Sequence, residues 1–196
     1  MKHRRALVIL SLILTCSLTM LAQASTETAI FAGGCFWSMQ HDFDKLPGVI
    51  STVVGYTGGH VTNPTYEQVS AGDTGHYEAI KVTYDSRKID YAKLVDFYWH
   101  DIDPGDASGQ FCDNGNEYHS VIFYRNAKQH NIADSSKSAL EATHRFDSVA
   151  TQVEPAQTFY PAEDYHQKYA EKNPLAYSAY RLGCRRDERT QAIWGN

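Results

Sequence analysis

The sequence lacks the patterns that mark specialised classes of chain. It has no internal repeat, no low-complexity tract and no stretch rich enough in proline, glycine or serine to separate two domains. Its composition, with 42% hydrophobic and 12% aromatic residues, excludes a disordered, coiled-coil or collagen-like protein. What remains is a globular domain with enough apolar side chains to build a core.

Motifs for common cofactors are also missing. The nine histidines form no His-Glu-x-x-His, the four cysteines form no Cys-x-x-Cys, and the pairs His76-x-Glu78 and Asp164-x-His166 stand alone. No glycine-rich phosphate loop and no Gly-x-Ser-x-Gly is present. We therefore expect no metal or other cofactor, and no serine hydrolase.

The first 24 residues have the pattern of a cleavable export signal. Basic residues precede an apolar run over residues 6–21, and Ala22-Gln23-Ala24 follows. A membrane anchor is the alternative, but the run is interrupted by serine and threonine and is short for a bilayer span. We expect cleavage after Ala24, export to the periplasm and a single domain over residues 25–196.

Removal of this leader makes the chain more acidic. The leader holds three of the 18 basic residues and none of the 23 acidic ones, so the remaining chain has a net charge of −8. A chain this acidic is unsuited to binding phosphate backbones, and we expect no nucleic-acid partner.

Three cysteines, Cys35, Cys112 and Cys184, remain after the leader. Exported proteins usually pair their cysteines, but three cannot all pair with one another. At least one should be free or should exchange partners, which favours thiol chemistry over a purely structural disulfide.

Alternating and helical hydrophobic patterns predict a mixed fold. Strands are expected near residues 29–32, 49–56, 78–85, 118–124 and 151–154, and helices over residues 36–46, 91–98, 127–144 and 162–172. Without regular strand–helix alternation, this order predicts an α+β two-layer sandwich, with helices covering a mostly antiparallel or mixed sheet. Long loops at residues 58–63 and 101–116 are candidate sites, and an irregular C-terminal tail is expected.

Cys35 occupies the most informative position. Gly33-Gly34 ends a predicted strand, so Cys35 falls in the first turn of the next helix, where free N–H groups and the helix dipole stabilise a thiolate. The alternative is an ordinary buried cysteine. Trp37 lies off the apolar stripe of this helix, and we expect it beside the thiol as a wall for an apolar group, or else packed on a neighbouring element.

Glu78 shares the apolar face of its strand with Ile80, Val82 and Tyr84. A carboxyl group buried there has a raised pKa and can donate a proton near neutral pH; the alternative is a strand end that turns out to solvent. Phenols that flank the loops can hydrogen-bond an oxygen while remaining neutral.

Several blocks resemble the A-type peptide methionine-(S)-sulfoxide reductase family. They run in family order between residues 29 and 173: Gly34-Cys35-Phe36-Trp37, Gly55-Tyr56-Thr57-Gly58-Gly59, Asn63-Pro64-Thr65-Tyr66, Gly72-Asp73-Thr74-Gly75-His76-x-Glu78 and Ala162-Glu163-Asp164-Tyr165-His166-Gln167.

The resemblance implies a role for each site residue. Cys35 would attack the sulfoxide sulfur, release methionine and become a sulfenic acid, while Glu78 protonates the oxygen. Phe36 and Trp37 would hold the S-methyl group. The matching phenols and carboxylate that bind the oxygen or support its hydrogen bonds are Tyr66, Tyr118 and Asp113.

The resemblance also requires a second thiol that resolves the sulfenic acid. Ser178 stands where the family often has this cysteine, so we assign the role to Cys184 in the tail, with Cys112 as the competitor. Cys112, Glu117 and His119 depart from the family's usual Asn, Gln and Arg, which changes the local charge balance.

The expected partners follow from the same resemblance: oxidised proteins, peptides or free methionine sulfoxide as substrate, and a thioredoxin-like dithiol as reductant, with the enzyme a monomer that repairs oxidised protein. Two rival interpretations remain. A papain-like cysteine hydrolase would use His166 and Asn173 with Cys35, and an exported binding module would carry a free thiol without catalysis.

Overall fold

The structure, a computed structural model, describes residues 25–195. The predicted export signal lies outside these residues. Among residues 25–195, no helix is long and apolar enough to cross a bilayer.

The central element is a six-stranded sheet in the order β7-β6-β1-β3-β2-β8. All neighbours are antiparallel except β6 and β7, which are parallel. Its strands are β1 (Thr26–Ala32), β2 (Val49–Thr57), β3 (Tyr77–Asp85), β6 (Val121–Tyr124), β7 (Gln152–Pro155) and β8 (Tyr160–Pro161). A separate small hairpin joins β4 (Gly109–Gln110) and β5 (Asp113–Asn114).

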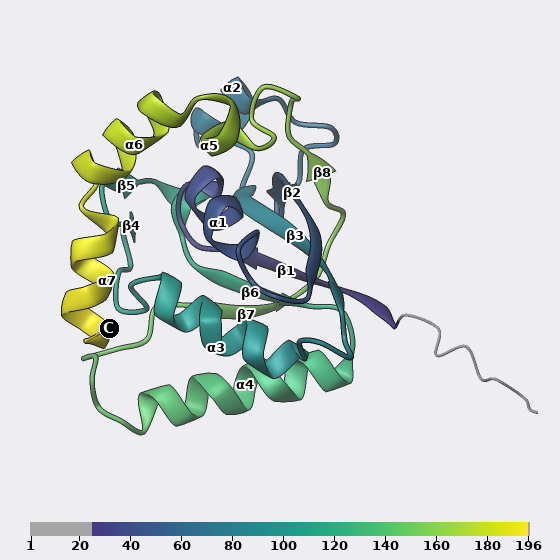
Figure 1. The fold of residues 1–196 in the computed structure, drawn as a ribbon, viewed down its shortest axis with the longest axis vertical. Coiled ribbons are helices and arrows are strands. Elements are labelled where there is room, and N and C mark those ends of the chain that lie inside the picture. The colour runs from purple at the N-terminus through teal and green to yellow at the C-terminus, as the bar shows by residue number, and fades with distance from the viewer. Residues whose placement is uncertain (1–24, 196) are drawn as a thin grey trace, which may run out of the picture.

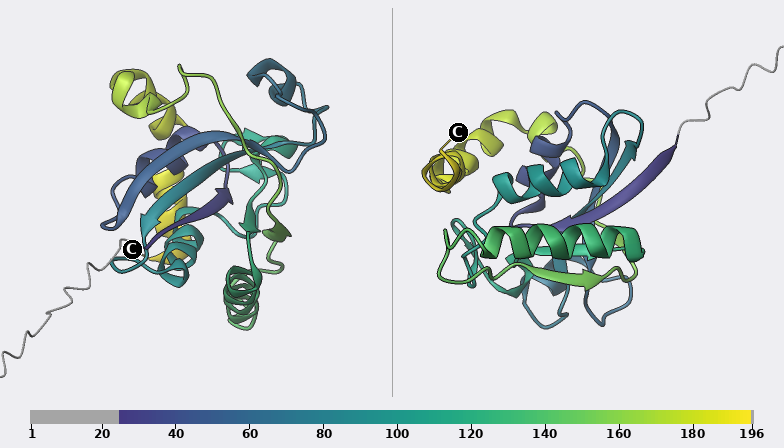
Figure 2. Two further views of the ribbon diagram at one scale, coloured as in Figure 1. Left: turned by 90° about the vertical axis from the view of Figure 1, so that its right-hand side faces the viewer. Right: turned by 90° about the horizontal axis from the view of Figure 1, so that it is seen from below.

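Helices α1 (Phe36–Phe43), α3 (Tyr91–Asp101) and α4 (Ala127–Glu141) cover one face of this sheet (Figures 1 and 2). The remaining helices are α2 (Tyr66–Ser70), α5 (Tyr169–Lys172), α6 (Pro174–Gly183) and α7 (Arg186–Trp194). Asp90 caps α3 through the Lys93 N–H, as its position before an apolar stripe suggests. The predicted α+β sandwich with a mixed, mostly antiparallel sheet is confirmed.

The larger core lies between the sheet and helices α1, α3 and α4. Phe31 of β1 stacks on Tyr98 and Tyr91 of α3 and contacts Phe43 of α1. The opposite face holds a smaller cluster around Ile30, Ala79 and Phe123. Because every second residue of a strand faces the same way, β1 and β3 contribute apolar side chains to both clusters.

Two predicted elements are wrong. The tail is not irregular, because α6 and α7 continue almost to its end and lie beside the β4–β5 hairpin (Figure 1). The helix expected over residues 162–172 is reduced to α5, whereas the rest of that segment is a loop held by side chains such as Gln167, which hydrogen-bonds both the N–H and the carbonyl of Val54. These contacts depend on a distant strand, so local periodicity does not show them.

Candidate active site

Cys35 sits where the chain leaves β1 and enters α1, as predicted. Gly34 has φ +81°, and a Cβ at this position would lie 2.6 Å from Cβ of Gln110. Only glycine fits both the conformation and the space. The turn places Cys35 at the N-cap of α1 with only 6% of its surface exposed, and it is the free cysteine of the described residues.

Glu78 lies beside this turn on β3. It is 3% exposed, and its Oε2 accepts the backbone N–H of Phe36 at 3.0 Å. Burial raises the pKa of Glu78 to about 8, with the negative charges of Asp113 and Glu117 adding to the shift and the Phe36 N–H opposing it. The predicted burial of this acid is confirmed, and the carboxyl group is mostly protonated at pH 7.

The expected thiolate is wrong for this state of the protein. Burial raises the pKa of the Cys35 thiol above its ordinary value, and the charges of Glu78 and Asp113 add to that effect. The nearby Tyr180 hydroxyl and the Trp37 backbone N–H oppose this rise without overcoming it. The helix start is present as predicted, but desolvation outweighs it, so the resting nucleophile is a neutral thiol.

The two phenols predicted from the loops both lie near this pair. Tyr66 begins α2, and Tyr118 ends a 3₁₀ turn over residues 116–118. Burial raises the pKa of each phenol, and the nearby carboxyl group of Glu78 adds to the shift of both. Both phenols therefore stay neutral and can donate hydrogen bonds to an oxygen.

Asp113 on β5 joins the same cluster. Its Oδ2 accepts the hydroxyl of Tyr180 at 2.5 Å. Burial raises the pKa of Asp113, and Tyr180 and the Cys35 N–H oppose that rise. The Tyr180 hydroxyl also lies beside the Cys35 thiol. Tyr180 was not predicted from the sequence, although Tyr177, Tyr180 and Cys184 are spaced three and four residues apart, as on one face of a helix.

Aromatic rings form the remaining wall. Phe36 is 1% exposed and packs on Tyr56 and His166, whereas Trp37 is only half-buried. The indole N–H of Trp37 donates to Nδ1 of His166 at 3.0 Å, and its ring stacks on Tyr169 with centroids 3.8 Å apart. The two alternatives for Trp37 therefore hold together: it borders the site beside Cys35, and it packs on a neighbouring element, α5.

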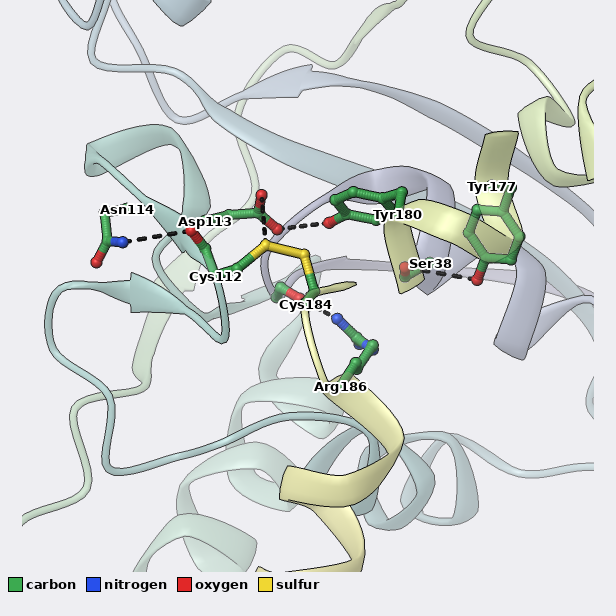
Figure 3. The surroundings of a disulfide bond; sticks show 9 residues. Ser38, Cys112, Asp113, Asn114, Tyr177, Tyr180, Cys184 and Arg186 are labelled. Carbon is green, nitrogen blue, oxygen red and sulfur yellow. Dashed lines mark hydrogen bonds between the residues drawn. A yellow bond between two sulfur atoms is a disulfide. The ribbon is translucent and has the colours of Figure 1, made fainter. Parts of the chain in front are cut away.

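Cys112 and Cys184 form a disulfide next to this cluster (Figure 3). Cys112 is exposed and adjoins Asp113, whereas Cys184 is buried at the end of α6. The two cysteines were expected to compete for one role, but in the structure they are bonded to each other. Ligand atoms of Cys112, Asp113 and Cys184 lie within 4.8 Å of one another, yet both sulfurs are bonded to each other and leave no thiolate for a metal.

Buried ion pairs fix the helices that carry Cys184. Arg186, 2% exposed, donates to the carboxylate of Asp101 at 3.0 Å and to its carbonyl at 2.7 Å, and lies over the ring of Phe111. Arg181 of α6 donates to Asp42 of α1 at 2.6 Å. These contacts hold the tail against the turn that presents Cys35.

The papain-like alternative finds no support in this arrangement. His166 directs Nδ1 to the Trp37 indole, and Asn173 lies at the junction of α5 and α6, where its amide donates to the Tyr169 carbonyl. Neither residue has the hydrogen bond to Cys35, or to the other, that a cysteine hydrolase requires.

Comparisons with known proteins agree with this geometry. The family described as peptide methionine sulfoxide reductase matches residues 27–196. A peptide methionine sulfoxide reductase MsrA 2 of Caulobacter vibrioides is 50% identical over 89% of each chain, and an MsrA of Limosilactobacillus reuteri is 51% identical over 88% of this chain and 99% of its own. The reduced form of Mxr1 from Saccharomyces cerevisiae, 30% identical, superposes with a TM-score of 0.73 over 78% of this chain and 88% of its own.

With a model match over nearly the whole described chain and relatives at half identity, the protein belongs to the peptide methionine sulfoxide reductase family, in its A-type branch.

Proposed function

We propose that the protein reduces the S epimer of methionine sulfoxide and passes the oxidation to a disulfide. The observation that carries this proposal is the pairing of one free thiol with a buried, mostly protonated carboxyl group, tied together because the N–H of Phe36 binds Glu78. Reduction of a sulfoxide needs both a sulfur nucleophile and a proton for the departing oxygen.

In the first step the sulfur of Cys35 attacks the sulfoxide sulfur, and Glu78 gives its proton to the oxygen. The hydroxyl then passes from the methionine sulfur to the Cys35 sulfur, as the S–O bond and the new S–S bond both break. Methionine leaves and Cys35 becomes a sulfenic acid; the thiol proton returns to Glu78, so the net reaction neither consumes nor releases a proton. Tyr66 and Tyr118 support the oxygen with their neutral hydroxyls. Trp37 binds the methyl group. The sulfoxide sulfur is chiral, with three different substituents, so fixing the methyl group at Trp37 and the oxygen at Glu78 selects one epimer.

A three-cysteine sequence then regenerates the thiol. The thiol of Cys184, the buried partner, attacks the sulfenic acid and forms a Cys35–Cys184 disulfide with release of water. Cys112 attacks the Cys184 sulfur, which yields the Cys112–Cys184 disulfide and frees Cys35. The assignment rests on exposure. Cys184 is buried, as is Cys35, so we assign it the attack on the sulfenic acid, whereas Cys112 is exposed and accessible to an external reductant.

An external dithiol completes the cycle by reducing the Cys112–Cys184 disulfide. The yeast relative Mxr1 has been solved in complex with Trx2, and we propose a reductant of the same thioredoxin type here. The leader pattern of residues 1–24 supports export to the periplasm, where the reductant must itself be recharged across a membrane. Repair of oxidised proteins is the cellular role that this chemistry serves.

The test measures dithiol-dependent reduction of the two sulfoxide epimers separately, in wild type and in Cys35→Ser. We expect activity on the S epimer alone and none in the variant. Equal activity on both epimers, or turnover by Cys35→Ser, would overturn the proposal, whereas hydrolysis of an acyl substrate without use of reductant would restore the papain-like alternative.

A further inference from the structure

Tyr180 brings a phenol from α6 directly to the nucleophile. Its hydroxyl donates to Oδ2 of Asp113 at 2.5 Å and lies beside the Cys35 thiol. Asp113 is also a neighbour of Cys35, so the phenol and the carboxylate lie together against the reacting sulfur. Figure 3 shows the phenol pointing at Asp113 beside the disulfide.

Both ends of the Tyr180–Asp113 hydrogen bond are attached to the Cys112–Cys184 disulfide. Asp113 follows Cys112 in the chain, and Tyr180 precedes Cys184 by one helical turn, with the Cys184 N–H donating to the Tyr180 carbonyl at 2.9 Å. The disulfide thus fixes how far α6 can lie from the β4–β5 hairpin. Without it, nothing covalent holds the phenol on the carboxylate.

The phenol also occupies the side on which a substrate has to arrive. The Tyr180 ring meets Trp37 edge-on with centroids 5.9 Å apart, and its hydroxyl lies beside the Cys35 thiol. A sulfoxide must place its sulfur on Cys35 and its methyl group against Trp37. Tyr180 and a bound sulfoxide therefore need the same space.

We propose that Tyr180 is a further residue of the catalytic site, whose phenol covers the Cys35 thiol while the Cys112–Cys184 disulfide is intact and withdraws when that disulfide is reduced. The inference rests on the proposed function, since that cycle forms and reduces the disulfide. The proposal therefore sets the order of the steps: a reductant must reduce the disulfide before the enzyme can bind a second sulfoxide.

Withdrawal requires little of the fold to move. The Arg181–Asp42 ion pair and the contact of the Tyr177 hydroxyl with Ser38 at 3.5 Å hold α6 on α1 independently of the disulfide. Tyr180 itself is half-buried. A change in its side-chain torsions, together with a shift of the short β4–β5 hairpin, is enough to uncover the thiol.

The experiment measures how fast iodoacetamide alkylates Cys35, by mass spectrometry of its peptide. Full-length protein is oxidised with diamide, which forms the disulfide without sulfoxide turnover, and the disulfide is verified in every variant by intact mass. The uncovered reference is Cys112→Ser/Cys184→Ser, in which Cys35 is the free thiol and no bridge can form. Leu182→Ala, 80% exposed on the same helix, is the matched control.

We expect oxidised wild type and Leu182→Ala to react about tenfold more slowly than the double serine variant, since a thiol covered by a side chain must be uncovered before it reacts. Oxidised Tyr180→Ala should react as fast as the reference. Tyr180→Phe keeps the ring and loses the hydroxyl. An alkylation rate between those of oxidised wild type and oxidised Tyr180→Ala also supports the proposal, and it separates the effect of the ring from that of the hydrogen bond to Asp113.

The proposal fails if oxidised wild type reacts as fast as the double serine variant, or if oxidised Tyr180→Ala stays as slow as wild type. Because the assay uses neither sulfoxide nor turnover, such a result leaves the proposed reductase activity standing. Conversely, if Tyr180 slows the alkylation of Cys35 as expected but the protein does not reduce the S epimer, this inference stands and the proposed reductase activity fails.

Discussion

The backbone N–H of Phe36 and the carboxyl group of Glu78 are joined by a buried hydrogen bond of 3.0 Å, across 42 residues of sequence. Phe36 directly follows Cys35, so the bond fixes the acid beside the nucleophile. Because Oε2 accepts this N–H, the other carboxyl oxygen is the one that carries the proton. The position of the acid therefore depends on the backbone of α1, and a side chain that keeps an acceptor should keep the geometry.

Glu78→Gln is expected to keep that hydrogen bond and lose the proton. The catalytic rate constant for the S epimer should fall about 100- to 10,000-fold, the usual contribution of a general acid. In wild type, activity should also decline above pH 8, where Glu78 ionises, and the residual activity of the variant should lack that decline. Steady-state kinetics between pH 6 and 9.5 check both; an unchanged pH profile in Glu78→Gln would refute the role of the acid.

The same group makes stability depend on pH. The pKa of Glu78 is raised from 4.5 to about 8 on folding, so the native state is favoured below pH 4.5, and this stability is lost as pH rises through 8. Glu78→Gln has no charge to bury. Urea unfolding should give similar free energies for the two proteins at pH 5, and an advantage to the variant on the order of 4 kcal/mol at pH 9. Equal stability at both pH values would show that Glu78 is solvated.

The positions of Glu78 and Cys35 could be predicted from the sequence, because each follows from a local pattern. Strict alternation along β3 placed Glu78 among apolar side chains, and paired glycines before an apolar stripe placed Cys35 at a helix start. Family blocks added the roles of the phenols. The ionisation state of Cys35 could not be read in this way, because it depends on the burial of the thiol in the folded protein and on the charges of Glu78 and Asp113, which are far along the chain.

The positions of the C-terminal helices could not be predicted from local patterns either. In α6 only Tyr177 is buried, and in α7 only Arg186, so burial of apolar side chains does little to hold either helix in place. Ion pairs with Asp42 and Asp101 hold them instead. Since these partners are far apart in sequence, their pairing could not be predicted, and neither could the disulfide between Cys112 and Cys184.

The hydrogen bond from Trp37 to His166 predicts an effect on binding. Burial lowers the pKa of His166, so its Nδ1 is free to accept at neutral pH. His166→Leu should leave the indole less well oriented and raise KM for the S epimer about 3- to 10-fold with little change in kcat, the scale of one hydrogen bond. A double-mutant cycle with Trp37→Phe, which cannot donate, checks the cause: additive effects of the two changes would mean that His166 does not act through the indole.

The buried Arg186–Asp101 pair predicts a large loss of stability. Arg186→Met leaves the Asp101 carboxylate buried without its partner, which should cost about 3–5 kcal/mol of unfolding free energy in urea. Asp101→Asn/Arg186→Met should recover part of that loss, because no charge remains unpaired. The neighbouring Arg185→Met, which breaks only the exposed pair with Glu188, should leave stability unchanged; a loss equal to that of Arg186→Met would show that the effect is not specific to the buried pair.

The order of the thiols can be read from two variants and one measurement. In Cys112→Ser, Cys184 can still attack the sulfenic acid, so a single turnover should release one methionine per enzyme and trap a Cys35–Cys184 disulfide. In Cys184→Ser the first methionine should still be released, but the sulfenic acid should persist long enough to be captured by dimedone. Mass mapping after one turnover distinguishes the two, and wild type should show the Cys112–Cys184 bond seen in the structure. A Cys35–Cys112 bond that forms in Cys184→Ser as fast as the wild-type disulfide would reverse the order, because the exposed thiol would then reach the nucleophile without the buried one.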